Sequence, residues 1–188
     1  PKTREKVMLE WCRINNRPIG DKEPSQAFLW RALDFLKEGG KAGMLVSAGV
    51  LFKHSMTNKA FREQWMSGVR LEEVFNFTHV RSFFFKGNSP FLALIFSKDR
   101  QNAHPVKYCS AKQVIPIKET QAVLISKYDV HVLRNEDLTS GELWKNLWFG
   151  RFADRNFLKQ LQLDKRLNSF VDRDKSGQGY KDRSESYW

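Results

Sequence analysis

The hydrophobic positions between residues 25 and 48 follow first a helical and then a strand-like pattern. We expect Ser25 to cap a helix and Gly39-Gly40 to end it, because these residue types favour those two positions. The apolar side chains that this helix should bury recur at helical spacing: Phe28, Ala32, Phe35 and Leu36. Residues 42–48 then form an almost uninterrupted apolar run, typical of a strand covered on both faces. A helix leading through Gly-Gly into such a strand predicts an α/β fold with a doubly wound sheet.

The remaining elements are predicted from the same kinds of pattern. A helix over residues 57–66 should end at Gly68 and bury three side chains, namely Ala60, Phe61 and Trp65. Residues 69–80 and 91–97 predict two strands, joined by the loop RSFFFKGNSP. Shorter strands are expected at residues 106–109, 122–125 and 129–133, and further helices at residues 141–147 and 153–161.

The composition is that of a globular protein. The chain has 188 residues, of which 41% are hydrophobic, so it can bury a core, and intrinsic disorder is excluded. Cys12 and Cys109 form neither a CxxC pair nor a metal quartet, and we therefore expect a cytoplasmic protein. No apolar run approaches the roughly 18 residues of a membrane span, so no membrane partner is expected.

The net charge of +11 points to a polyanion as partner, and nucleic acid is the commonest polyanion of the cytoplasm. The excess is densest over residues 51–107, which hold nine basic and four acidic side chains. The alternative interpretation of the charge alone is an ordinary solvated Lys/Arg surface.

Short motifs that mark a nucleotide, metal or nucleophile site are missing. There is no GxGxxG, no GxxxxGK[ST], no HExxH and no GxSxG in the chain. The four histidines are spaced about 25 residues apart, which does not suit a metal site. We therefore predict no catalytic side chain and no metal ligand in this segment.

The loop over residues 81–90 is the segment whose composition departs most from an ordinary surface. Three consecutive aromatic residues, Phe83, Phe84 and Phe85, precede Lys86-Gly87-Asn88. Exposed aromatic rings beside basic and amide groups suit base stacking combined with phosphate contact. The alternative is that the rings fill the core, and we expect at least one of the three to do so.

The order of elements and motifs resembles the C-terminal half of the catalytic domain of N6-adenine DNA methyltransferases from restriction-modification systems, with the gamma-class motif order. The resemblance is carried by Val46–Leu51 in place of a V-P-x-x-x-L loop, by Phe61-Arg62, by a loop with Phe85, and by an apolar antiparallel strand ending at Lys98. The segment ELWKNLWFGRFADRNFLKQL is similar to the passage towards the target-recognition region. The resemblance covers roughly residues 24–161.

The resemblance implies a fold, a reaction and a set of DNA contacts. The fold would be the C-terminal half of a Rossmann-like sheet with an antiparallel last strand, followed by a small α+β extension. The reaction is methyl transfer from S-adenosylmethionine to adenine N6 in double-stranded DNA, with the target base flipped from the duplex. Phe85, or alternatively Phe84, would stack on that base, and the expected DNA contacts are Lys53, His54, Arg81, Lys86, Asn88, Arg151 and Arg155.

The chain also departs from the family pattern. Neither the Gly-rich turn for S-adenosylmethionine nor an NPPY-type motif is present, and Asn88-Ser89-Pro90-Phe91 resembles that motif only superficially because it runs into a strand. We therefore expect residues 1–23 to be a connecting segment that follows a missing motif. Residues 24–138 should form the C-terminal half of a methyltransferase domain, and residues 139–188 should form a helical junction towards the target-recognition region. Such a half-sheet should leave one edge and part of its faces uncovered.

Three hypotheses follow from the sequence. The first is a part of a DNA methyltransferase, inactive by itself, whose parent has restriction or specificity subunits as possible partners. The second is a non-catalytic nucleic-acid-binding module that uses the basic aromatic loop. The third is a basic scaffold domain in which the phenylalanines belong to the core.

Overall fold

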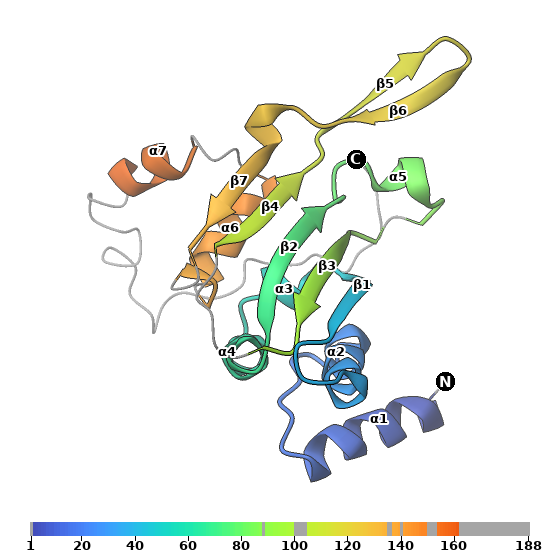
Figure 1. Ribbon diagram of the computed structural model, residues 1–188, viewed down its shortest axis with the longest axis vertical. Coiled ribbons are helices and arrows are strands. Elements are labelled where there is room, and N and C mark those ends of the chain that lie inside the picture. Colours follow the sequence, from blue (N-terminus) through green and yellow to red (C-terminus); the bar gives the residue numbers. More distant parts are fainter. Residues whose placement is uncertain are drawn as a thin grey trace, which may run out of the picture. The chain divides into compact units, whose positions relative to one another are not determined.

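A computed structural model of the chain describes residues 2–87, 89–99, 105–134, 137–139, 141–149 and 154–161 (Figure 1). Its elements, in chain order, are α1 (Lys2–Ile14), α2 (Pro24–Phe35), β1 (Lys41–Ser47), α3 (Gly49–Phe52), α4 (Met56–Ser67), β2 (Arg70–Asn76), α5 (Arg81–Phe84), β3 (Phe91–Ser97), β4 (Val106–Ser110), β5 (Gln113–Ile117), β6 (Thr120–Leu124), η1 (Lys127–Asp129), β7 (Val130–Leu133), α6 (Gly141–Phe149) and α7 (Asp154–Leu161). The chain divides into two compact units, Pro1–Phe152 and Ala153–Trp188, and α7 is the described part of the second. Among the described residues, no helix has the length and apolar character needed to cross a bilayer.

The first unit is built on a five-stranded sheet with the order β1-β3-β2-β4-β7. Strand β3 lies between β1 and β2 and is antiparallel to both, so β1 and β2 run parallel to each other. Strand β4 is parallel to β2, and β7 is antiparallel to β4. The predicted α/β class and the antiparallel strand over residues 91–97 are confirmed. The hairpin of β5 and β6 forms a separate sheet beyond β4 (Figure 1).

Large aromatic side chains fill the core between the sheet and its helices. Trp65 of α4 is fully buried, stacks on Phe61 and contacts the edge of Phe96 in β3. Phe52 of α3 packs against Trp144 of α6, which is also fully buried. Helix α6 therefore belongs to the same core as α3.

Helix α2 buries a different face from the predicted one. Phe28 and Phe35 are 61% and 77% exposed, whereas Trp30 and Leu33 are buried in the core. The helix itself carries apolar side chains on all sides, so their spacing does not show which side is buried. Packing against the rest of the core decides which side that is. Ser25 is not the N-cap as expected. That position is occupied by Glu23, with a proline at the first helical position.

Strand β1 is not covered on both faces as its composition predicted. Leu45 on one of its faces is 62% exposed, and among the described residues β1 pairs with β3 alone.

Three other predictions from the sequence differ from the structure. Residues 1–23 were expected to be a connecting segment, but α1 occupies most of them. This helix forms because Lys2–Ile14 contains no proline or glycine and many good helix formers. Strand β5 was missed because proline disfavours a strand interior. Pro116 is tolerated because β5, among the residues that the structure describes, pairs with β6 alone. Ala60 was predicted to be buried but is exposed, whereas Arg62 of the same helix is buried.

Candidate functional site

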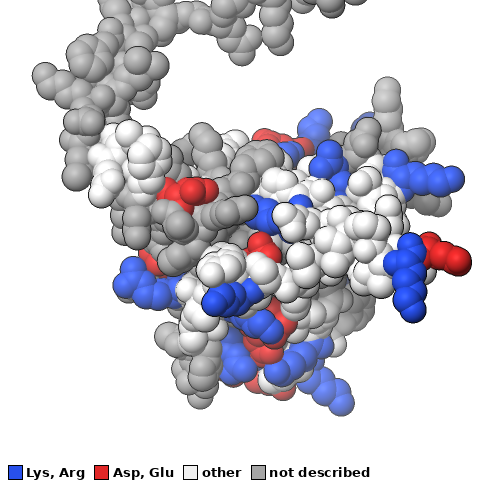
Figure 2. Space-filling model, turned by 90° about the horizontal axis from the view of Figure 1, so that it is seen from above, with Lys and Arg blue, Asp and Glu red and all other residues white. Residues whose placement is uncertain are grey.

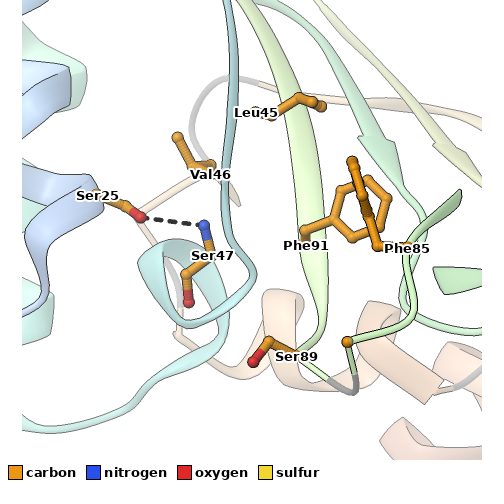
Figure 3. A pocket seen from close by; sticks show the side chains of 8 residues that line it. Ser25, Leu45, Val46, Ser47, Phe85, Ser89 and Phe91 are labelled. Atoms are coloured by element: carbon orange, nitrogen blue, oxygen red, sulfur yellow. Dashed lines mark hydrogen bonds between the residues drawn. The ribbon is translucent and has the colours of Figure 1, made fainter. Parts of the chain in front are cut away.

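A hollow of about 290 Å³ lies where the first strand of the sheet ends (Figure 3). Its walls come from the start of α2, the end of β1, the loop after α5 and the start of β3: Ser25, Leu45, Val46, Ser47, Phe85, Gly87, Ser89 and Phe91. We call this hollow the β1 pocket. Its volume is close to the lower end of the range for small-molecule sites.

The β1 pocket lies at the edge of the sheet where ligands of α/β folds commonly bind. The parallel strands β1 and β2 end at this edge, and the antiparallel strand β3 begins there. Ser47 pairs directly with Phe91, and the backbone N–H of Ala48 donates to the carbonyl of Pro90 at 3.0 Å. The β ladder therefore fixes the two walls of the pocket that come from β1 and β3.

The three consecutive phenylalanines after β2 are exposed, which corrects the expectation that at least one fills the core. Phe83, Phe84 and Phe85 are 39%, 44% and 53% exposed, because the single turn of α5 carries them along the surface. Phe85 contacts Phe91 edge-to-face at 5.2 Å between ring centroids and lines the pocket. Phe84 does not line the pocket and packs instead against three rings, those of Phe77, Phe83 and Phe91. Of the two predicted stacking residues, Phe85 is therefore the one on the pocket wall.

The wall opposite the phenylalanines is polar. The backbone N–H of Ser47 donates to the hydroxyl of Ser25 at 3.1 Å, which joins α2 to the end of β1 (Figure 3). The Ser47 hydroxyl donates to Glu23 Oε2 at 3.4 Å and accepts the backbone N–H of Gly49 at 3.2 Å. This set of bonds makes one side of the pocket hydrogen-bonding and the other aromatic.

The predicted DNA-contact residues have different surroundings. The Lys53 ammonium lies 3.6 Å from the carboxylates of both Asp21 and Glu23, so its charge is already compensated. Arg81 is half-buried and donates from Nη1 to the Thr78 carbonyl at 2.6 Å, within its own loop. Lys86 is exposed and stands next to Phe85 in the chain.

The remaining predicted contacts are less closely tied to the pocket. His54 is exposed beyond the end of α3. Asn88 and Arg151 lie outside the described residues, and Arg155 belongs to α7 in the second unit. Figure 2 shows the molecule from above, where Lys and Arg side chains alternate with Asp and Glu side chains around uncharged surface.

A buried polar network beneath the pocket was not anticipated from the sequence. Gln26 accepts the backbone N–H of Gly20 at 2.6 Å and donates to Asn58 at 2.6 Å, and Asn58 donates to Asp21 at 2.8 Å. These bonds hold the segment before α2 against α4. Partners up to 37 positions apart leave no local pattern, so no sequence signal could have identified the network.

Arg62 is the second feature that sequence reasoning did not interpret. Its guanidinium is 1% exposed and donates from Nη1 to the carbonyls of Leu51 and Lys53 at 3.3 and 2.5 Å. Burial lowers the pKa of this guanidinium. Arg62 therefore holds the chain that leaves α3, immediately beyond the β1 pocket.

The turn after β1 is not an open glycine cradle, and the described residues hold no cluster of metal ligands. A glycine follows β1, but a Cβ at Gly49 would meet Lys53 at 3.0 Å and Glu23 at 3.3 Å, so that turn is filled rather than open. In the part of the chain that the structure describes, no group of three His, Cys, Asp or Glu side chains could hold a metal. What the site offers is an aromatic wall, a polar wall and one adjacent exposed lysine, Lys86, which suit a planar heterocycle attached to a phosphate.

Comparison with known families assigns the chain to a class. The sequence model of the N-6 DNA Methylase family matches residues 9–164. This match covers most of the chain, and the chain belongs to the N-6 DNA Methylase family. No curated protein sequence matches it significantly.

Comparison with solved structures finds three similar chains from restriction-modification proteins. The type IIG restriction endonuclease BpuSI is 13% identical, with a TM-score of 0.50 over 90% of this chain and 21% of that one. The M protein of the type I restriction enzyme EcoKI is 15% identical, with a TM-score of 0.43 over 52% of this chain and 22% of that one. A structure reported for complex assembly and conformational transition of a type I R-M system is 12% identical, with a TM-score of 0.47 over 81% and 39%. The chain thus spans between about a fifth and two fifths of the length of these proteins.

Proposed function

We propose that this chain is the part of an N6-adenine DNA methyltransferase that receives the target base, in a restriction-modification or phage-defence system. The observation that carries the proposal is the position of Phe85 on the wall of the β1 pocket, at the edge where β1 and β2 end. An aromatic ring there can stack on an adenine that has left the duplex, and stacking contributes about 1–3 kcal/mol per base. Membership of the N-6 DNA Methylase family supports the methyl-transfer reaction over a non-catalytic binding module.

S-adenosylmethionine is the methyl donor we propose for the complete enzyme. The described residues offer it no cradle, so the role we assign to this chain is limited to the target base and the adjacent phosphates. Isothermal calorimetry should show no micromolar binding of S-adenosylmethionine to the isolated chain, and methylation assays should show no activity. Micromolar binding would contradict this division of roles.

Double-stranded DNA is the proposed partner, with restriction or specificity subunits in the assembled system. The net charge of +11 supports DNA, because Lys and Arg that neutralise phosphates release counterions and so add affinity. A cytoplasmic location is supported by two free cysteines, Cys12 and Cys109.

The base-stacking role can be tested by 2-aminopurine fluorescence. The probe is a duplex that carries 2-aminopurine opposite an abasic site, where leaving the stack costs little. Addition of the chain should change the fluorescence as the base enters the pocket. Phe85→Ala should remove that change while anisotropy still reports binding of the duplex.

Phe83→Ala provides the matched control, because Phe83 is an exposed ring of the same loop that does not line the pocket. It should behave like the wild type. An unchanged response of Phe85→Ala would exclude the β1 pocket as the target-base site.

A further inference from the structure

Three serine hydroxyls line the β1 pocket, and they differ in what they can still offer to a ligand. Ser47 uses its hydroxyl on both sides, since it donates to Glu23 and accepts from Gly49. Its backbone N–H is also used, on the hydroxyl of Ser25. Ser47 therefore shapes the wall but has no free donor for a ligand.

The Ser25 hydroxyl has a fixed position and an unused proton. It accepts from Ser47 N–H at 3.1 Å, a bond that links the first turn of α2 to the last residue of β1. Among the hydrogen bonds of the described residues, Ser25 donates to no acceptor. A hydroxyl carries one donor and two acceptor positions, so an oriented donor remains at the pocket wall.

Ser89 provides the contrast within the same pocket. It is exposed on the loop before β3, and its hydroxyl makes no hydrogen bond with any described residue. An exposed hydroxyl without an orienting bond loses more rotational freedom on binding than one that is already held. Of the three serines, Ser25 alone combines a held position with a free donor.

We infer that Ser25 is a base-recognition residue, whose hydroxyl donates a hydrogen bond to a ring nitrogen of the adenine that occupies the β1 pocket. This inference rests on the proposed function and adds to it the residue that reads the edge of the base. The ring nitrogens N1, N3 and N7 of adenine are acceptors only, which matches the proton that the Ser25 hydroxyl still has to donate. Stacking on Phe85 is tolerant of base identity, whereas this bond is not.

The test is a titration of the full 188-residue chain with 2′-deoxyadenosine and with its 1-deaza, 3-deaza and 7-deaza analogues. Binding is followed by NMR at the amide of Gly87 and the methyl groups of Leu45, both on the pocket wall. Ser25→Ala should weaken binding of 2′-deoxyadenosine about fivefold, the effect of one lost neutral hydrogen bond. The same substitution should have no effect on the one analogue that lacks the nitrogen bound by Ser25.

Two further variants separate recognition from structure. Ser89→Ala should bind all four nucleosides like the wild type. Ser25→Thr keeps the hydroxyl and should retain the preference for the intact purine. An equal loss on all four nucleosides in Ser25→Ala would show a purely structural role and overturn the inference, as would wild-type affinity of Ser25→Ala for 2′-deoxyadenosine. Absence of any binding by the wild-type chain would instead overturn the proposed function itself, and with it this inference.

Discussion

The rings of Phe85 and Phe91 meet edge-to-face, with 5.2 Å between their centroids and 71° between their planes. Phe91 is the first residue of β3 and is held by its pairing with Ser47 of β1. Phe85 lies on the loop before β3 and remains 53% exposed. One ring is thus part of the sheet, and the other lies on the wall of the β1 pocket with about half of its surface exposed.

This arrangement predicts that the two candidate stacking residues differ in their effects on stability. Phe84→Ala removes contacts with three rings and should lower the free energy of unfolding by about 1–2 kcal/mol. Phe85→Ala removes one edge contact and should lower it by less than about 0.5 kcal/mol. Urea denaturation followed by tryptophan fluorescence would measure both. A larger loss for Phe85→Ala than for Phe84→Ala would indicate that Phe85 has a structural role instead.

The salt dependence of DNA binding should distinguish Lys86 from Lys53. Lys86→Gln should reduce the slope of log K against log salt by about one, because an exposed cation beside the pocket can neutralise one phosphate. Lys53→Gln should leave the slope nearly unchanged, since Lys53 already faces Asp21 and Glu23. Fluorescence anisotropy at several salt concentrations provides the slopes. Equal changes for the two substitutions would show that Lys53 leaves its carboxylates to bind DNA.

Gly20→Ala should destabilise the chain strongly. A Cβ at this position would lie 2.4 Å from the side chain of Asn58 and 2.7 Å from its backbone nitrogen, so the buried Gln26–Asn58 network must move. We expect a loss of about 2–3 kcal/mol in the free energy of unfolding, because displaced buried polar groups lose their partners. Gly87→Ala is the matched control, as nothing lies within 4 Å of the added carbon. Thermal denaturation of the two variants should therefore show a lower midpoint for Gly20→Ala only.

Tyr108 should make stability depend on pH in the alkaline range. Its buried hydroxyl accepts from Asn76 at 2.9 Å and donates to the Leu147 carbonyl at 2.8 Å. Burial raises the pKa of Tyr108 from 10.0 to about 12. Between pH 10 and about 12 the unfolded chain releases a proton that the folded chain keeps, so stability falls as the pH rises.

Tyr108→Phe should remove that part of the pH dependence and should lower stability at pH 8 by about 1–3 kcal/mol, because Asn76 and the Leu147 carbonyl are left unpaired. Urea denaturation at pH 8 and pH 11 would measure both effects. Tyr128→Phe, at a 69% exposed position, should change neither. If Tyr108→Phe lost as much stability between pH 8 and pH 11 as the wild type, the pH dependence would come from other groups.

Much of the fold could be predicted because the relevant signals are local. The apolar run over residues 91–97 and the Ser55–Gly68 boundaries of α4 depend on neighbours along the chain, and both elements are found close to where the sequence predicts them. The buried face of α2 could not be predicted in the same way. Apolar residues lie all around that helix, and the contacts of Trp30 and Leu33 decide which side is inside.

The candidate site shows the same division. Residue type and position relative to β3 predicted Phe85 as a stacking residue, a role that stays a prediction, and the structure brings its side chain to the pocket wall. The polar wall formed by Ser25 and Ser47 was not predicted, because the two residues are 22 positions apart and meet only where α2 packs beside β1. The ion pairs of Lys53 with Asp21 and Glu23 were not predicted for the same reason, because the two acidic residues lie about 30 positions away in the chain.

By itself, the sequence determined the class of fold, the family to which the chain belongs and the aromatic, basic character of the loop before β3. These properties follow from hydrophobic periodicity, residue type and motif order, which a linear chain displays in full. The tertiary structure alone decided which phenylalanine reaches the β1 pocket, which lysine is compensated and which serine keeps a free donor. Those outcomes depend on hydrogen bonds and contacts between distant segments, and only the folded chain brings such segments together.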